Sequence, residues 1–200
     1  MEQPAQTSLA LVFQPLAAER WPDLEALFGA RGACGGCWCM TWRLTRAEYE
    51  REKGESNRRA FHEIVASGTP VGLLAYVESE PVAWCAIAPR PEFPTLERSR
   101  ILKRVDDQPV WSVVCFFVKR GYRRKGVSTR LLKAAVAFAA AHGARIVEGY
   151  PVEPRKAEMP PVFAWTGLAA SFRHAGFVEV ARRSETRPIM RIELPERAPL

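Results

Sequence analysis

The stretch "VWSVVCFFVKRGYRRKGVSTRLLKAAVAFAAAHG", residues 110–143, decides the fold. Its first part, up to Val118, is almost continuously apolar and rich in β-branched and aromatic residues, which predicts a buried strand. The part from Val127 to His142 predicts a long helix that is closed by Gly143. A strand, a short basic turn and a helix therefore form the centre of the chain.

The basic turn between this strand and this helix predicts an anion-binding site. A strand that turns directly into a helix leaves the first helical N–H groups unpaired, and the helix dipole adds positive potential there. Gly126 has no side chain to keep the backbone away from a ligand, and Arg123, Arg124 and Lys125 surround it. We therefore expect a phosphate-bearing ligand on the backbone of residues 123–129. The alternative is an ordinary solvated start of a basic helix.

The distribution of charge supports a local anionic ligand. The net charge is +7, and eight Lys and Arg residues but no Asp or Glu lie between Gln108 and Val147. The rest of the chain holds 21 basic and 22 acidic residues, so the whole excess comes from one strand–turn–helix unit. The chain has no recognisable nucleic-acid-binding motif beside this charge, which makes nucleic acid the less favoured partner.

Length and composition predict one soluble domain over residues 1–200, because 48% hydrophobic residues suffice for a core. The N-terminus lacks the pattern of a signal peptide, and the longest apolar run, residues 134–141, is too short to cross a bilayer. We therefore expect a cytoplasmic protein without membrane contact. Five cysteines, an odd number, predict no disulfide framework there. A homodimer stays open.

Hydrophobic periodicity and turn residues predict the remaining elements. The capping-box spacing of Thr45 and Glu48 marks the start of a helix. The expected helices are 20–29, 45–67 with a break near Gly54, 127–142 and 162–176. The expected strands are 8–16, 71–78, 82–88, 109–118, 144–152, 177–183 and 187–194, with a connecting excursion at 89–109. This order predicts a mixed α/β sandwich.

The segment "RRKGVS" at 123–128 resembles the (Q/R)-x-x-G-x-(G/A) signature of the GCN5-related N-acetyltransferases, the GNAT superfamily. The apolar strand before it, the "LL" at 131–132, the late "SFRHAGF" at 171–177 and the element order along nearly the whole chain are also similar to this family. The resemblance implies an α/β fold with a mixed, mostly antiparallel central sheet flanked by helices. It further implies a strand pair that splays apart at the coenzyme site.

The same resemblance implies an acetyltransferase that moves the acetyl group of acetyl-CoA to a primary amine by direct attack. The pyrophosphate would bind the amides of residues 124–129, and the pantetheine arm would pair with the exposed strand. The backbone N–H of Val118 would stabilise the oxyanion. The expected coenzyme-binding residues are Phe116, Phe117, Val118, Arg123, Arg124, Lys125, Gly126, Val127, Ser128, Thr129 and Phe172.

Three positions depart from the family pattern. Ser128 replaces the usual Gly or Ala, Phe172 stands where many members carry a proton-donating tyrosine, and Ser112 stands where some carry a glutamate base. Glu153, at the carboxyl end of a strand, and Cys115 are the candidate catalytic side chains, although an exposed carboxylate and an inert thiol are the bland alternatives. A noncatalytic acyl-CoA-binding or sensing module on the same fold is the alternative function.

The motif "CGGCWCMTW" at 34–42 lies in a Cys- and Trp-rich loop at 30–44. Its three thiols are one ligand short of a structural zinc site, so we expect no metal, but the sequence leaves open whether Cys34, Cys37 and Cys39 bind one. In the resembled family this segment lies across the acceptor side. The expected acceptor-binding residues are therefore Cys37, Trp38, Trp42, Arg43 and Tyr150, for a small-molecule or peptide amine. A core-packing plug is the alternative.

Overall fold

The computed structural model describes residues 9–155 and 160–195. Its centre is a sheet of seven strands in the order β1-β2-β3-β4-β5-β7-β6. The β4–β5 pair is parallel, and every other neighbouring pair is antiparallel. The strands are β1 (Val12–Pro15), β2 (Gly72–Val77), β3 (Glu80–Pro89), β4 (Trp111–Val118), β5 (Ile146–Gly149), β6 (Val178–Arg182) and β7 (Pro188–Glu193). The expected mixed, mostly antiparallel sheet is confirmed.

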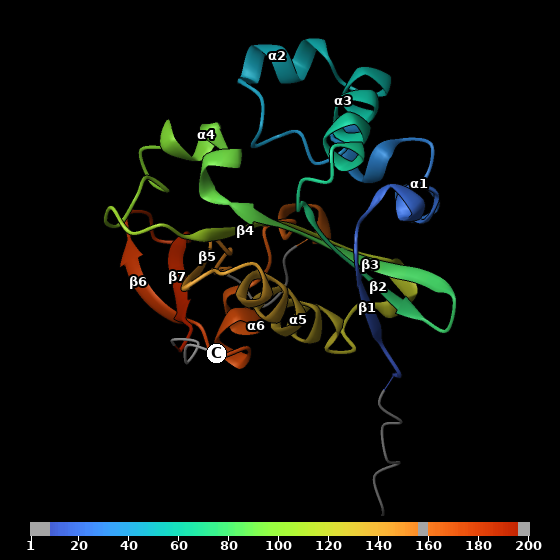
Figure 1. Ribbon diagram of the computed structural model, residues 1–200. Helices are drawn as coiled ribbons and strands as arrows, with labels where there is room; N and C mark the ends of the chain where they lie inside the picture. The colour runs from blue at the N-terminus through green and yellow to red at the C-terminus, as the bar shows by residue number, and fades with distance from the viewer. Residues whose placement is uncertain (1–8, 156–159, 196–200) are drawn as a thin grey trace, which may run out of the picture.

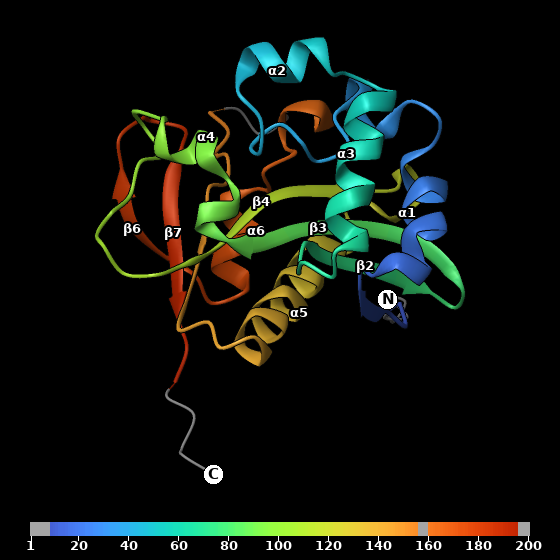
Figure 2. The same cartoon turned by 45° about the horizontal axis from the view of Figure 1, so that its top comes forward.

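Helices cover both faces of the sheet. The long helix α5 and the short helix α6 lie on one face, whereas α1, α2 and α3 lie on the other (Figures 1 and 2). None of the helices in the described ranges is long and apolar enough to cross a membrane. The helices are α1 (Trp21–Phe28), α2 (Arg46–Arg51), α3 (Glu55–Ala66), α4 (Pro94–Glu97), α5 (Val127–Ala141) and α6 (Ala169–His174). Shorter turns lie at Ala18–Arg20, Gly32–Gly36, Arg90–Glu92, Arg120–Tyr122 and Pro161–Phe163.

The strand β3 shows why the sheet is buried on both sides. Its side chains alternate between two cores: Cys85 and Ile87 pack with α5, whereas Trp84 and Ala86 pack with α1 and α3. Successive side chains of a strand point to opposite faces, so a strand covered on both faces is apolar throughout. The continuous apolar runs in the sequence are the direct consequence.

The local signals for helix boundaries hold well in the first half of the chain. The Thr45 hydroxyl accepts a hydrogen bond from the Glu48 amide at 3.3 Å, and the Glu48 carboxylate accepts one from the Thr45 amide at 2.8 Å. This confirms the capping box. Gly54 breaks the helical pair as expected, with φ of 86°. The first strand is shorter than its expected range, and Ser8, its expected first residue, lies outside the described residues.

The expected helix over residues 162–176 is wrong in its first half, because α6 begins at Ala169. The preceding segment makes strand-like hydrogen bonds instead. The Phe116 amide donates to the Trp165 carbonyl at 2.6 Å, and the Val152 amide donates to the Gly167 carbonyl at 2.9 Å. Gly167 has φ of 87°, which a right-handed helix does not tolerate. Hydrogen bonds to β4 and to the chain after β5 therefore keep this segment out of the helix, although its apolar residues are spaced as in a helix.

A buried ionic network attaches the excursion between β3 and β4 to the sheet. The guanidinium of Arg90 is 2% exposed and donates to the Glu148 carboxylate at 3.0 Å and to the Leu102 carbonyl at 2.9 Å. Arg191 binds the other oxygen of Glu148 at 2.6 Å, and the Tyr150 hydroxyl donates to the same carboxylate at 2.6 Å. Two guanidinium groups therefore compensate a carboxylate that is wholly shielded from water.

We predict that Glu148→Gln lowers the free energy of unfolding by about 3 kcal/mol, because breaking a buried ion pair leaves uncompensated charge behind. Equilibrium urea unfolding measures this loss. Glu185→Gln is the matched control, since Glu185 pairs with Arg155 where both side chains are exposed. That pair is worth less than about 1 kcal/mol. Equal losses of unfolding free energy in the two variants would contradict the larger contribution to stability that we assign to the buried network.

Candidate functional site

A cavity of about 1360 Å³ runs along the edge of β4 that faces away from β3. Its floor is the β4 backbone and the segment before α6. The basic turn that precedes α5 and the loop between α1 and α2 both contribute to the lining. The cavity therefore joins the two stretches that the sequence singles out, the basic turn and the cysteine-rich loop.

The β4 edge is exposed because its pairing with β5 stops early. β5 pairs with Trp111, Ser112 and Val113, and no further along β4. Val114 is an extra residue in the register with β3, since Ile87 lies opposite Val113 and Ala86 opposite Cys115. Such a bulge bends a strand and re-aims the residues after it. The two strands thus splay apart beyond Val113.

Backbone amides of β4 point into this splay. The Lys119 amide donates to the Val82 carbonyl at 2.9 Å, which fixes its direction toward β3. Since amides of successive residues in a strand point to opposite sides, those of Val118 and Phe116 point away from β3. The Phe116 amide is bound to the Trp165 carbonyl, whereas Val118 lines the cavity. The Val118 N–H is thereby directed into the splay.

The turn before α5 has the geometry of an anion site. Arg124 and Gly126 have φ of 62° and 72°, and alternating left-handed conformations of this kind direct neighbouring N–H groups to one side. Gly126 precedes the first turn of α5 and provides no capping side chain, so the first helical amides stay available. The residues of this turn that line the cavity are Arg123, Arg124, Gly126, Val127, Ser128 and Thr129. Lys125 lies outside the lining, with its ammonium 5.8 Å from the centre of the Tyr122 ring.

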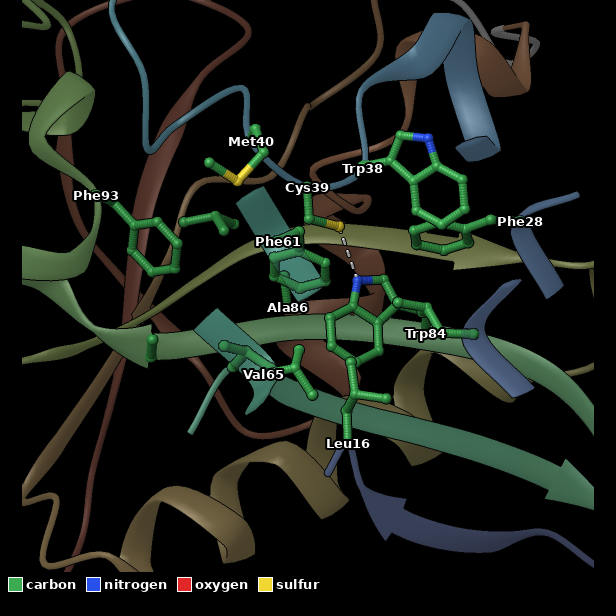
Figure 3. Close-up of a cluster of buried hydrophobic side chains, with 14 of the residues drawn as sticks. Leu16, Phe28, Trp38, Cys39, Met40, Phe61, Val65, Trp84, Ala86 and Phe93 are labelled. Atoms are coloured by element: carbon green, nitrogen blue, oxygen red, sulfur yellow. Dashed lines mark hydrogen bonds between the residues drawn. The ribbon is translucent and has the colours of Figure 1, made fainter. Parts of the chain in front are cut away.

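The loop between α1 and α2 divides its side chains between the core and the cavity. Trp38 is 3% exposed and packs on Phe28, with ring centres 5.6 Å apart (Figure 3). The ring centre of Trp21 lies 5.9 Å from that of Trp38. A Cβ atom on Gly32 would lie 2.2 Å from the Trp38 indole nitrogen, so glycine is required there. Trp38 was expected to bind the acceptor; the structure corrects this, because the ring is a core residue outside the cavity lining.

Four cysteines, Cys34, Cys37, Cys39 and Cys115, line the cavity. The Trp84 indole N–H donates to the Cys39 sulfur at 3.0 Å (Figure 3). A hydrogen bond to Cys39, followed by burial, raises the pKa of the Cys115 thiol well above its usual range, and burial raises the pKa of Cys37. These two thiols are therefore protonated at neutral pH. Within residues 9–155 and 160–195, no group of three or more His, Cys, Asp or Glu side chains is arranged to hold a metal ion.

Trp42 and Arg43 are neighbours with different environments. The Trp42 indole N–H donates to the Val114 carbonyl at 3.2 Å, and its ring lies 5.6 Å from that of Trp165 at the cavity wall. The guanidinium of Arg43 instead binds the Glu92 carboxylate at 2.9 Å and lies outside the lining. Burial lowers the pKa of Arg43 despite this partner. Arg43 is therefore placed to hold the excursion, not an acceptor.

Three other expected site residues lie outside the cavity lining. Phe172 is fully buried, and a Cβ atom on Gly149 would lie 2.1 Å from its ring, so it fills space beneath the cavity. Tyr150 is buried in the ionic network, where burial and the Glu148 carboxylate raise its pKa. Hydrogen bonds from Arg182 and Arg173 lower the pKa of Glu153, which makes this carboxylate a weaker base.

Several lining residues were missed from sequence. Phe28, Cys34 and Tyr49 flank or belong to the cysteine-rich loop, so proximity to that motif could have indicated them. No sequence pattern indicated that Trp165 and Ser171 line the cavity. Trp165 was expected within a helix, and Ser171 directly precedes Phe172, the position that was compared with the family's tyrosine.

A sequence model described as the Acetyltransferase (GNAT) family matches residues 38–157. No curated protein is similar enough to match. Among solved structures, a GNAT-family acetyltransferase from Listeria monocytogenes is 9% identical, with 92% of this chain and 95% of that chain covered and a TM-score of 0.58. The PaiA N-acetyltransferase of Thermoplasma acidophilum in complex with coenzyme A is 16% identical, with coverage of 92% and 99% and a TM-score of 0.51. YncA of Salmonella typhimurium with its cofactor acetyl-CoA is 12% identical, with coverage of 95% and 97% and a TM-score of 0.52.

These similarities establish the fold, and the family match extends over more than half of the chain, including β4, the basic turn and α5. The chain therefore belongs to the GNAT family of acetyltransferases.

Proposed function

We propose that this protein is an N-acetyltransferase that transfers the acetyl group of acetyl-CoA to a primary amine by direct attack. One observation carries the proposal: a single cavity joins the anion site before α5, the Val118 amide and the wall of the cysteine-rich loop. Membership of the family supports acyl transfer in general, and two solved relatives of the same fold hold coenzyme A or acetyl-CoA.

The donor would bind at the basic end of the cavity. Backbone amides at the start of α5, together with the positive end of the helix dipole, suit the pyrophosphate of the coenzyme. Arg123 and Arg124 add charge, and the Ser128 hydroxyl, in place of Gly or Ala, adds a further hydrogen-bond donor. The pantetheine arm would extend along the β4 edge toward Val118, and at Phe116 it would compete with the Trp165 carbonyl.

In the reaction, a neutral amine attacks the thioester carbonyl, the new C–N bond forms and the C–S bond breaks. The Val118 N–H points into the splay, where it can stabilise the oxyanion. The nitrogen loses a proton, and the departing coenzyme thiolate gains one. The Phe172 side chain has no ionisable proton, and Glu153 is bound by two guanidinium groups. We therefore assign proton exchange to solvent in the open cavity. Positioning of the two reactants then supplies much of the acceleration.

The alternative is a noncatalytic acyl-CoA-binding module. It is favoured by Phe172 and Ser112, since the former is buried and the latter is hydrogen-bonded to the Tyr150 hydroxyl at 2.9 Å. Isothermal calorimetry with acetyl-CoA, followed by thiol release with a panel of amines, separates the two functions. Coenzyme binding without thiol release would favour the module. Binding of duplex DNA without coenzyme binding would overturn both.

We predict that Gly126→Asp weakens acetyl-CoA binding about 100-fold, because the carboxylate would face the bound phosphates, which corresponds to about 2.7 kcal/mol. Gly126→Asn is the matched control: it has the same size and tolerates the left-handed conformation at φ of 72°, but it carries no charge. The Asn variant should lose much less affinity in calorimetry. If the Asp variant stayed folded and bound acetyl-CoA normally, the turn would not hold the pyrophosphate.

We predict that Glu153→Gln leaves kcat within about twofold of the parent, and that both enzymes gain activity in parallel as the pH rises. The arginine partners lower the pKa of Glu153, so this carboxylate is a poor base, and the amine is deprotonated without it. A pH profile of kcat/KM tests this. A fall of about 100-fold in the variant would instead restore Glu153 as the general base.

We expect Cys115→Ser to behave similarly, because the raised pKa of the Cys115 thiol makes it a poor proton carrier at neutral pH. Circular dichroism would check that each variant is folded. A loss of turnover in folded Cys115→Ser would assign the proton transfer to that thiol.

A further inference from the structure

Apart from the basic turn, part of the cavity lining is a wall of thiols and aromatic rings. We define the acceptor wall as Phe28, Cys34, Cys37, Trp42, Tyr49 and Phe117. Five of these side chains come from the region between α1 and α2, or from the ends of those helices, and one comes from β4. The wall therefore assembles around the loop between α1 and α2, and none of its residues belongs to the basic turn.

Two polar groups of the acceptor wall already have partners within the protein. The Trp42 indole N–H donates to the Val114 carbonyl, and the Cys37 thiol donates to the Gly32 carbonyl at 3.5 Å. Burial raises the pKa of the Tyr49 hydroxyl, so this group carries no negative charge at neutral pH. What the wall presents to a ligand is thus mainly ring faces and sulfur, which favour apolar contact.

Two carboxylates on segments that flank the cysteine-rich loop are also paired. The Glu48 carboxylate binds the Thr45 amide and hydroxyl, at 2.8 and 2.6 Å, and Glu92 binds the Arg43 guanidinium. The charged side chains among the described lining residues are Arg123 and Arg124, which lie at the coenzyme end. A ligand with several positive charges would lose its hydration at the wall without gaining a carboxylate partner.

Resting on the proposed acetyltransfer, we propose that the acceptor is an arylalkyl monoamine, whose flat apolar group lies on the acceptor wall and whose single amine faces the β4 edge. Burial of the aryl group supplies the binding energy. An apolar environment disfavours the charged form of the amine, so the same wall shifts the bound amine toward the neutral form that attacks a thioester. The apolar acceptor wall then explains both the preference for an aryl group and the reaction's independence of a general base.

Thiol release with 2-phenylethylamine, tryptamine, ethylamine and spermidine tests the proposal on the intact protein. We expect kcat/KM for the two arylalkylamines to exceed that for ethylamine and for spermidine by about 10- to 100-fold, the value of burying one aromatic group. A higher kcat/KM for spermidine would show that the wall binds cations through its ring faces and would overturn the proposal. Coenzyme binding without thiol release from any amine would instead overturn the acetyltransferase function itself.

Substitutions at Trp42 test the wall directly. Trp42→Leu should lower kcat/KM for tryptamine about 10-fold more than kcat/KM for ethylamine, because it removes the ring face. Trp42→Phe also loses the hydrogen bond to Val114 but keeps a ring, and it should retain most of the preference. Trp111→Leu is the matched control. Trp111 lies on the same strand as Val114, but its ring packs on that of Phe138 in α5, with ring centres 6.0 Å apart.

The control should change kcat/KM for both amines by the same factor. An equal effect of Trp42→Leu on tryptamine and ethylamine, in a folded variant with parental acetyl-CoA affinity in calorimetry, would rule out the acceptor wall as the determinant of specificity.

Discussion

The parallel pairing of β4 with β5 ends at Val113, and the rest of the site depends on this limit. Two constraints impose it. The bulge at Val114 shifts β4 out of register, and the ring of Phe172 occupies the space over Gly149, the last residue of β5. Just before this point, Glu148 of β5 binds Arg191 of β7 and holds the two strands together, and just after it the Tyr150 hydroxyl donates to the same carboxylate. A strand edge is thus left open inside the molecule, where the Val118 amide has no neighbouring strand of the sheet as its partner.

The segment before α6 fills part of the opening that this splay creates. It bonds to β4 through the Trp165 carbonyl and to the chain after β5 through Gly167, so it bridges the two diverging strands. A Cβ atom on Gly167 would lie 2.7 Å from the Phe172 ring, which shows how closely the bridge packs on the core beneath it. The cavity and the hydrophobic core therefore share a boundary. A ligand that pairs with β4 meets a partly satisfied edge, and the Val118 amide is the group that stays directed toward it.

Much of this arrangement could be predicted from sequence, for identifiable reasons. The β4–turn–α5 unit carries strong local signals: an apolar strand, a basic turn that contains a glycine, and a long alanine-rich helix. The capping box at Thr45 is likewise local. The rest depends on contacts distant in sequence. Apolar residues in a loop have the same sequence pattern whether they face a core or a cavity, so the sequence did not distinguish the core position of Trp38 from a position in the cavity. The ionic partners of Glu148 lie 58 and 43 residues away in the sequence, so no local pattern indicates them. Backbone pairing with β4 displaced the helix expected around Trp165.

The cysteine-rich loop shows how one segment satisfies two demands that the sequence left as alternatives, a core plug and a cavity wall. Trp38 and Cys39 have φ of 39° and 57°, a conformation that costs a residue with a side chain about 1 kcal/mol or more. Burial of the Trp38 ring against Phe28, and the hydrogen bond from Trp84 to the Cys39 sulfur, offset this cost. The strained backbone directs Trp38 into the core while Cys37 and Cys39 on either side reach the cavity. Packing of Trp38 in the core therefore also holds Cys37 and Cys39 at the cavity, because the same turn fixes the directions of all three side chains.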